Sequence, residues 1–151
     1  MNTIDYFKLQ AKNLHRDFKT QVPLVDKTIG SFRHEYSPKY FQIYDIISDF
    51  DIDEGNFTLM NAQHVIANIA GFDKWGTLIK LSESELELAK LLFEHQDKID
   101  WISWNFYIAE AQSMNEDELD ADAQVDIFKQ VVIEGNIFDM VIDSYLIKED
   151  Y

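Results

Sequence analysis

The chain has 151 residues, no cysteine and a formal net charge of −15. A chain of this length is expected to form one domain, and 46% hydrophobic residues supply a packed core, which excludes global disorder. Without cysteine there are no disulfides, thiolate metal sites or thiol nucleophiles, and the composition fits a reducing compartment.

Most of the negative charge belongs to one half of the chain. Residues 1–75 contain 8 Lys/Arg and 10 Asp/Glu, whereas residues 76–151 contain 5 and 18. An acidic field repels nucleic-acid phosphate and attracts basic surfaces. The charge therefore predicts a basic protein partner and argues against direct nucleic-acid binding.

The sequence contains no recognisable export signal or membrane segment. Its first residues lack the basic and apolar regions of a signal peptide, and no later stretch approaches ~18 uncharged apolar residues. We expect a cytoplasmic protein that does not associate with membranes.

The predicted elements of the first third are two helices and one irregular stretch. Apolar residues recur at helical spacing over residues 4–18, and Ser37-Pro38 has the form of a helix start, which predicts a second helix over 38–49. Between them, residues 19–36 hold either a short β-hairpin or only a loop.

The rest of the chain is also predicted to be helical. A helix capped by Asn56 or Thr58 should end at Gly71, and Ser82 has a glutamate three positions later, as a capping box requires. Ser82 should open a helix in which Leu86, Ala89, Leu92 and Phe93 share one face. Further helices are expected over 59–70, 73–79, 98–113, 116–134 and 136–148, although residues 130–139 could instead form a hairpin.

These patterns predict an all-α or nearly all-α fold of six to eight helices in one compact domain, residues 1–151. A near-neutral half, residues 1–81, contains a Gly-Phe-x-x-Trp corner at Gly71 to Trp75. An acidic helical half, residues 82–151, follows it.

No catalytic, cofactor-binding or metal-ligating set is recognisable. Residues 49–55 open like a calcium loop, but Glu54 stands where glycine is needed and Met60 stands where a glutamate should close the site. No two histidines have the spacing of paired metal ligands. Whether His34 or His64 lines a pocket is left open by the sequence.

The predicted helix 98–113 has two apolar faces. Ile99, Ile102, Phe106 and Ala109 make one face, and a second, nearly opposite face contains Trp101, Trp104, Ile108 and Ala111. A helix that is apolar all round is normally buried all round, so we favour a central core helix. The alternative is that the Trp face is an interface, including that of a homodimer.

An acidic cluster follows this helix, with six carboxylates within eleven residues: Glu116, Asp117, Glu118, Asp120, Asp122 and Asp126. Acidic side chains are stabilised at the N-terminus of a helix, and this accounts for some of the six carboxylates. The remainder form a solvated patch or a docking surface for a basic partner. The candidate partner-binding residues are therefore Trp101, Trp104, Ile108, Asp117, Glu118, Asp120, Asp122 and Asp126.

Residues 61–75, Asn-Ala-Gln-His-Val-Ile-Ala-Asn-Ile-Ala-Gly-Phe-Asp-Lys-Trp, carry one family resemblance, with Gln-Ala-Lys-Asn-Leu at 10–14 as its second part. The segment resembles the short helical domain of bacterial cytoplasmic proteins catalogued as glyoxalase-related. In that group the pattern Ala-x-x-x-Ile-Ala-x-x-x-Gly-Phe-x-x-Trp recurs. The resemblance implies a helical corner and no catalytic residues, since glyoxalase enzymes use a βαβββ metal site that this sequence does not offer.

Three functions are weighed. The favoured hypothesis is a non-enzymatic protein-binding module for a basic partner, of the inhibitor, antitoxin or immunity-protein kind. The second is a nucleic-acid mimic, which requires surface carboxylates in two rows at phosphate-like spacing. The third is an enzyme whose site is assembled from residues distant in the sequence.

Overall fold

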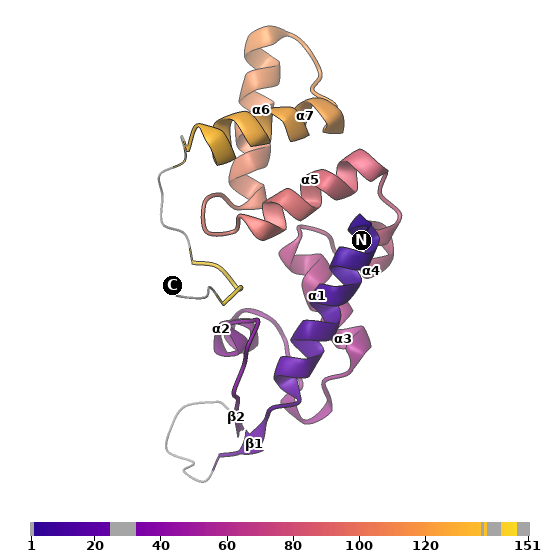
Figure 1. Ribbon diagram of the computed structural model, residues 1–151, viewed down its shortest axis with the longest axis vertical. Coiled ribbons are helices and arrows are strands. Elements are labelled where there is room, and N and C mark those ends of the chain that lie inside the picture. Colours follow the sequence, from indigo (N-terminus) through magenta and orange to yellow (C-terminus); the bar gives the residue numbers. More distant parts are fainter. Residues whose placement is uncertain (1, 25–32, 137, 139–142, 148–151) are drawn as a thin grey trace.

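The computed structural model describes residues 2–24, 33–136, 138 and 143–147. This part of the chain contains seven α-helices and one two-stranded antiparallel hairpin, so the prediction of a mainly helical, compact domain is confirmed (Figure 1). None of the described helices has the length and apolarity needed to cross a membrane.

The elements follow one another with short connections. Their bounds are α1 Thr3–Phe18, β1 Val22–Pro23, β2 His34–Glu35, α2 Ile43–Asp49, η1 Glu54–Asn56, α3 Leu59–Ile69, α4 Trp75–Ile79, α5 Glu83–Glu94, α6 Trp101–Asn115, α7 Ala121–Phe128 and η2 Lys129–Glu134. The hairpin alternative for residues 19–36 is therefore correct in its described part, where Val22 pairs with Glu35.

Local sequence explains several helix boundaries. Thr58 and Asn61 form a reciprocal capping box at the start of α3, and the Ser82 hydroxyl accepts the Glu85 N–H at the start of α5. Gly71 follows α3 with φ +96°, a left-handed conformation that glycine adopts without steric cost. These predicted stops and starts are confirmed.

The first of two hydrophobic clusters joins α1, α2, α3 and one face of α5. Phe7, Leu14 and Ile66 are fully buried in it, and Leu86, Ala89 and Phe93 of α5 complete it. Phe7 and Phe93 meet edge to face, with ring centroids 5.8 Å apart. Because α1 packs on both α3 and α5, this cluster holds the N-terminal helices together.

The second cluster lies on the other side of α5, between α5, α6, α7 and η2. Trp104 is fully buried at its centre, against Phe128 of α7, and its indole Nε1 donates to Gln124 Oε1 at 3.1 Å. Leu88, Leu91 and Leu92 of α5 pack against this cluster. Figure 1 accordingly shows α5 between α1 and the α6–α7 pair.

Helix α2 begins later than Ser37-Pro38 predicts. The buried carboxylate of Asp17 accepts the backbone N–H groups of Lys39, Tyr40 and Phe41 at 2.9, 2.8 and 2.7 Å. A carboxylate can satisfy three converging N–H groups, so these residues are held in an irregular loop and the helix starts at Ile43.

The predicted last helix, 136–148, is wrong for residues 143–147, and most of its other residues lie outside the described part. Leu146 makes a β-bridge with Phe41, and the Gln42 N–H donates to the Tyr145 carbonyl at 2.8 Å. By pairing with the loop before α2, the backbone of this segment gains hydrogen-bond partners. The last residues of an isolated helix would lack such partners for their carbonyl groups. The hairpin alternative over 130–139 is also wrong where described, because η2 is helical to Glu134.

Replacing Asp17 by alanine should lower the free energy of unfolding by about 3 kcal/mol or more, because buried N–H groups would lose their acceptor. Asp5→Ala, which removes an exposed acid from the first turn of the same helix, should cost at most about 1 kcal/mol. Urea denaturation of the two variants measures the difference. Equal losses would contradict the role given to Asp17.

Candidate functional site

The two apolar faces of α6 have different environments. The face that contains Trp104 is buried, and the face that contains Phe106 is exposed. Trp104 and Ile108 are 0% and 5% exposed and belong to the second cluster. Their selection as partner-binding residues is therefore wrong, since a side chain buried in the core cannot contact a partner. The hypothesis of a core helix is therefore confirmed for Trp104 and Ile108, whereas Trp101, predicted on the same face, is not buried.

The opposite face, which the sequence suggested would be buried, is exposed within α6, whereas Ile99, which precedes the helix, is buried in the second cluster. Phe106 is 75% exposed and Ile102 is 50% exposed, and both share this face with Ala109. Trp101, 37% exposed, lies at its margin. We call Trp101, Ile102, Phe106 and Ala109 the outer strip of α6. Large apolar side chains gathered on one exposed face are typical of interaction surfaces.

The part of the chain that contains the outer strip is negatively charged, and it has no lysine or arginine to offset that charge. Residues 99–128 contain eight Asp/Glu and no Lys or Arg. The Lys–carboxylate ion pairs among the described residues join Lys90 to Glu94 and Lys129 to Glu87, so neither involves this stretch. The outer strip therefore lies in a negative field.

The acidic residues that follow α6 occupy three kinds of structural position: the loop before α7, the N-cap of α7 and one face of α7. Asp117 and Glu118 are exposed in the loop between α6 and α7, while Asp120 caps α7 through the Ala123 N–H at 2.9 Å. Only Asp122 and Asp126 share a face of α7, and Asp122 accepts the Ser84 hydroxyl. Carboxylates placed this way do not form the two regular rows that nucleic-acid mimicry requires.

Trp101 and the loop acids lie at opposite ends of α6. This helix has 15 residues, which corresponds to roughly 20 Å from its first residue to its last. The acids that share a pocket with Trp101 are instead Asp100, Asp143 and Glu85, none of which was selected from the sequence. The approach of Asp143 and Glu85 to Trp101 depends on tertiary contacts, whereas Asp100 is the preceding residue and was predicted to lie inside the helix 98–113.

Trp101 and Leu92 line both of two neighbouring pockets. One, of about 380 Å³, also involves Gly71, Phe72, Leu88 and Glu85. The other, of about 350 Å³, is lined by Phe50, Ile102, Tyr145 and the carboxylates of Asp100 and Asp143, among others. The position of the Trp101 ring therefore determines the shape of both.

Gly71 determines where that ring lies. A Cβ atom built at Gly71 would be 2.9 Å from Cδ2 of Trp101, closer than real Cβ contacts. The indole thus rests on the bare backbone of the corner between α3 and α4. Asn68 Nδ2 braces this corner by donating to the Phe72 carbonyl at 2.9 Å.

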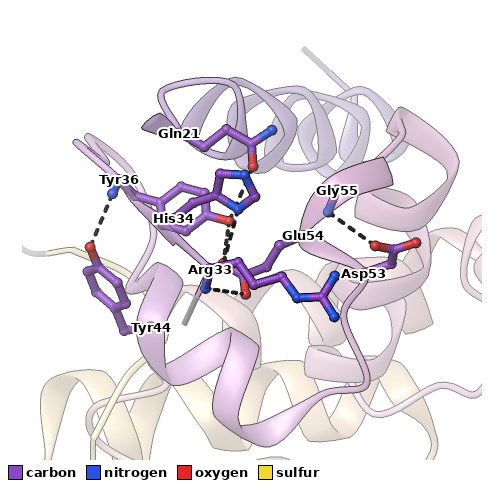
Figure 2. A network of polar contacts seen from close by, with 8 residues as sticks. All are labelled: Gln21, Arg33, His34, Tyr36, Tyr44, Asp53, Glu54 and Gly55. Atoms are coloured by element: carbon purple, nitrogen blue, oxygen red, sulfur yellow. Dashed lines mark hydrogen bonds and ion pairs between the residues drawn. The ribbon is translucent and has the colours of Figure 1, made fainter. Parts of the chain in front are cut away.

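A separate polar network surrounds Glu54, far along the chain from α6. Figure 2 shows the buried Glu54 carboxylate accepting the Tyr36 hydroxyl at 2.9 Å and the Arg33 N–H at 3.1 Å, with His34 Nδ1 3.7 Å away. Burial, and then the hydrogen bond to Glu54, raise the pKa of Tyr36, so its hydroxyl remains a donor at neutral pH. The network ties the hairpin to η1.

Neither histidine considered from the sequence lines one of the described pockets. His64 is exposed on α3, and His34 lies beside the pocket formed by Arg33, Asp51, Asp53 and Glu54 without being part of its wall. Among the described residues, no group of three or more histidines and carboxylates is placed to hold a metal ion.

Comparison with protein-family models, curated proteins and solved structures found no match. The resemblance to the glyoxalase-related domain therefore stays a prediction. In the corner itself, Phe72 and Trp75 pack against the first cluster, which contains Ile66 and Ala70.

Substituting Gly71 by alanine should destabilise the fold by about 1–2 kcal/mol, since a positive φ is unfavourable for alanine. It should also change the emission of Trp101, which the new Cβ would displace. Gly76→Ala is the matched control, because a Cβ there meets nothing within 4 Å and alanine favours the helix. Denaturation followed by fluorescence measures both effects; an unchanged spectrum and stability in Gly71→Ala would disprove the Gly71–Trp101 contact.

Proposed function

We propose that this chain is a non-enzymatic protein-binding module that docks a basic partner on the outer strip of α6. The supporting observation is the exposure of Phe106 and Ile102 on one face of a helix whose other face is core. The one charged residue of α6 is the acidic Glu110, and Asp100 precedes the helix as its N-cap. Apolar anchors inside a field of one sign favour a partner of the opposite sign.

Apolar burial and electrostatic attraction have separate roles in the proposed binding. Burying apolar side chains such as Phe106 and Ile102 contributes roughly 1.5–3 kcal/mol each when burial is complete, which provides affinity. The surrounding carboxylates act over about 10 Å at moderate ionic strength and therefore mainly accelerate encounter. Of the candidates chosen from the sequence, Trp101 remains in the docking surface, and Asp117, Glu118, Asp120, Asp122 and Asp126 contribute to the field.

A basic partner is favoured over a second copy of the same chain. Two α6 helices facing each other would bring together acidic surfaces that have no Lys or Arg between residues 99 and 128. Like charges brought together at an interface are costly. Such a module, acting in the cytoplasm, fits the way inhibitors, antitoxins and immunity proteins neutralise a basic target.

Capture from an extract of the source cells tests this function with a matched pair of variants. Phe106→Ser removes an apolar side chain that is 75% exposed on α6, and Met60→Ser removes one that is 76% exposed at the start of α3. Each should change stability by less than about 0.5 kcal/mol, because neither side chain is part of the core.

The wild type and Met60→Ser should retain the same basic protein, and Phe106→Ser should lose it. Raised ionic strength should weaken the retained complex. If no basic protein meets both conditions, or if the two variants behave alike, the proposed function is wrong.

A further inference from the structure

The pocket on the Ile102 side of Trp101 combines three aromatic rings with two carboxylates. Its rings come from distant parts of the chain: Phe50 at the end of α2, Trp101 at the start of α6 and Tyr145 in the C-terminal segment. The rings of Phe50 and Tyr145 lie 5.6 Å apart between centroids. Aromatic faces carry partial negative charge and attract cations.

The two carboxylates add full negative charge to the same pocket. Asp100 uses Oδ1 to cap α6, accepting the Ser103 N–H at 2.6 Å, and Asp143 is exposed at the rim. No Lys or Arg is among the described residues that line it. An apolar ligand would desolvate these carboxylates without compensation, and an anion would be repelled.

The walls are held in place before any ligand arrives. The Tyr145 hydroxyl donates to Asp49 Oδ2 at 2.6 Å, and the Tyr145 N–H donates to Gln96 Oε1 at 3.1 Å. Burial, and then the hydrogen bond to Asp49, raise the pKa of Tyr145 above its ordinary value. A preformed site loses less conformational entropy on binding.

Resting on the proposed function, we infer that this pocket binds the guanidinium group of an arginine side chain presented by the basic partner. A guanidinium is planar and weakly hydrated, so it stacks on aromatic rings while donating paired hydrogen bonds to carboxylates. A lysine ammonium is compact and strongly hydrated, and it gains less from ring faces. Ile102 belongs to both the pocket wall and the outer strip, so one partner can cover the strip and insert the arginine.

The direct test uses the purified chain and three small probes: N-acetyl-arginine amide, N-acetyl-lysine amide and the neutral isostere N-acetyl-citrulline amide. Binding is followed by the NMR shift of the Trp101 indole N–H and of the Asn68 backbone N–H, since both residues line the pocket. The arginine probe should cause a saturable shift, the lysine probe a weaker one, and citrulline none.

Asp143→Asn should weaken the arginine probe roughly threefold to tenfold, the range expected for partly exposed charge-assisted contacts. Asp100→Asn should act similarly while preserving the fold, because asparagine caps helices as well as aspartate. Glu134→Gln removes the same unit of charge from the exposed end of η2, outside the pocket, and should leave binding unchanged. Equal binding of arginine and citrulline probes, or equal effects of all three variants, would overturn the inference.

The two proposals fail in different ways. If Phe106→Ser abolishes capture of a basic protein while Asp143→Asn and Asp100→Asn do not weaken it, the docking function stands and the arginine pocket is wrong. If the arginine probe binds with the expected variant pattern but no basic protein is captured, the pocket stands as a guanidinium site and the docking function is wrong.

Discussion

The fold depends on one helix that is apolar on two sides. Leu86, Ala89 and Phe93 of α5 complete the first cluster, while Leu88, Leu91 and Leu92 pack against the second. A helix with two apolar stripes must be covered on both sides, so α5 lies between the N-terminal helices and the α6–α7 pair. Without α5, both the N-terminal helices and the α6–α7 pair would expose apolar surface to water.

This arrangement also explains why α6 is only half covered. The second cluster comprises side chains from α5, α6, α7, η2 and nearby connections, and it covers the Trp104–Ile108 face. Phe106 and Ile102 on the opposite face remain exposed within the described structure. Apolar surface that a helix leaves open to water is what a partner can bury, which connects the packing of α5 with the proposed function.

The C-terminal segment contributes to the proposed pocket through non-local pairing. Its bridge from Leu146 to Phe41 brings Tyr145 and Asp143 alongside Trp101, although more than forty residues separate them in the sequence. Apolar periodicity reports only on neighbours along one helix, so it predicted a helix over 136–148 instead. The late start of α2 also results from non-local contacts. Asp17 accepts the Phe41 N–H and Leu146 forms a bridge with Phe41, so the loop before α2 is held in a non-helical conformation.

The sequence by itself determined the helical class and the boundaries at Gly71 and Ser82, because these depend on local capping and backbone preference. It left open whether residues 19–36 form a hairpin or a loop and whether Asn56 or Thr58 caps α3, and the structure decided for the hairpin and for Thr58. The sequence also determined where the negative charge lies along the chain. Only the tertiary structure decided which face of α6 is core. The two faces are about equally apolar, so their burial depends on which neighbouring helices pack there. The meeting of Trp101 with Gly71 and Asp143 likewise depends on contacts between elements that are distant in the sequence, which no local pattern encodes.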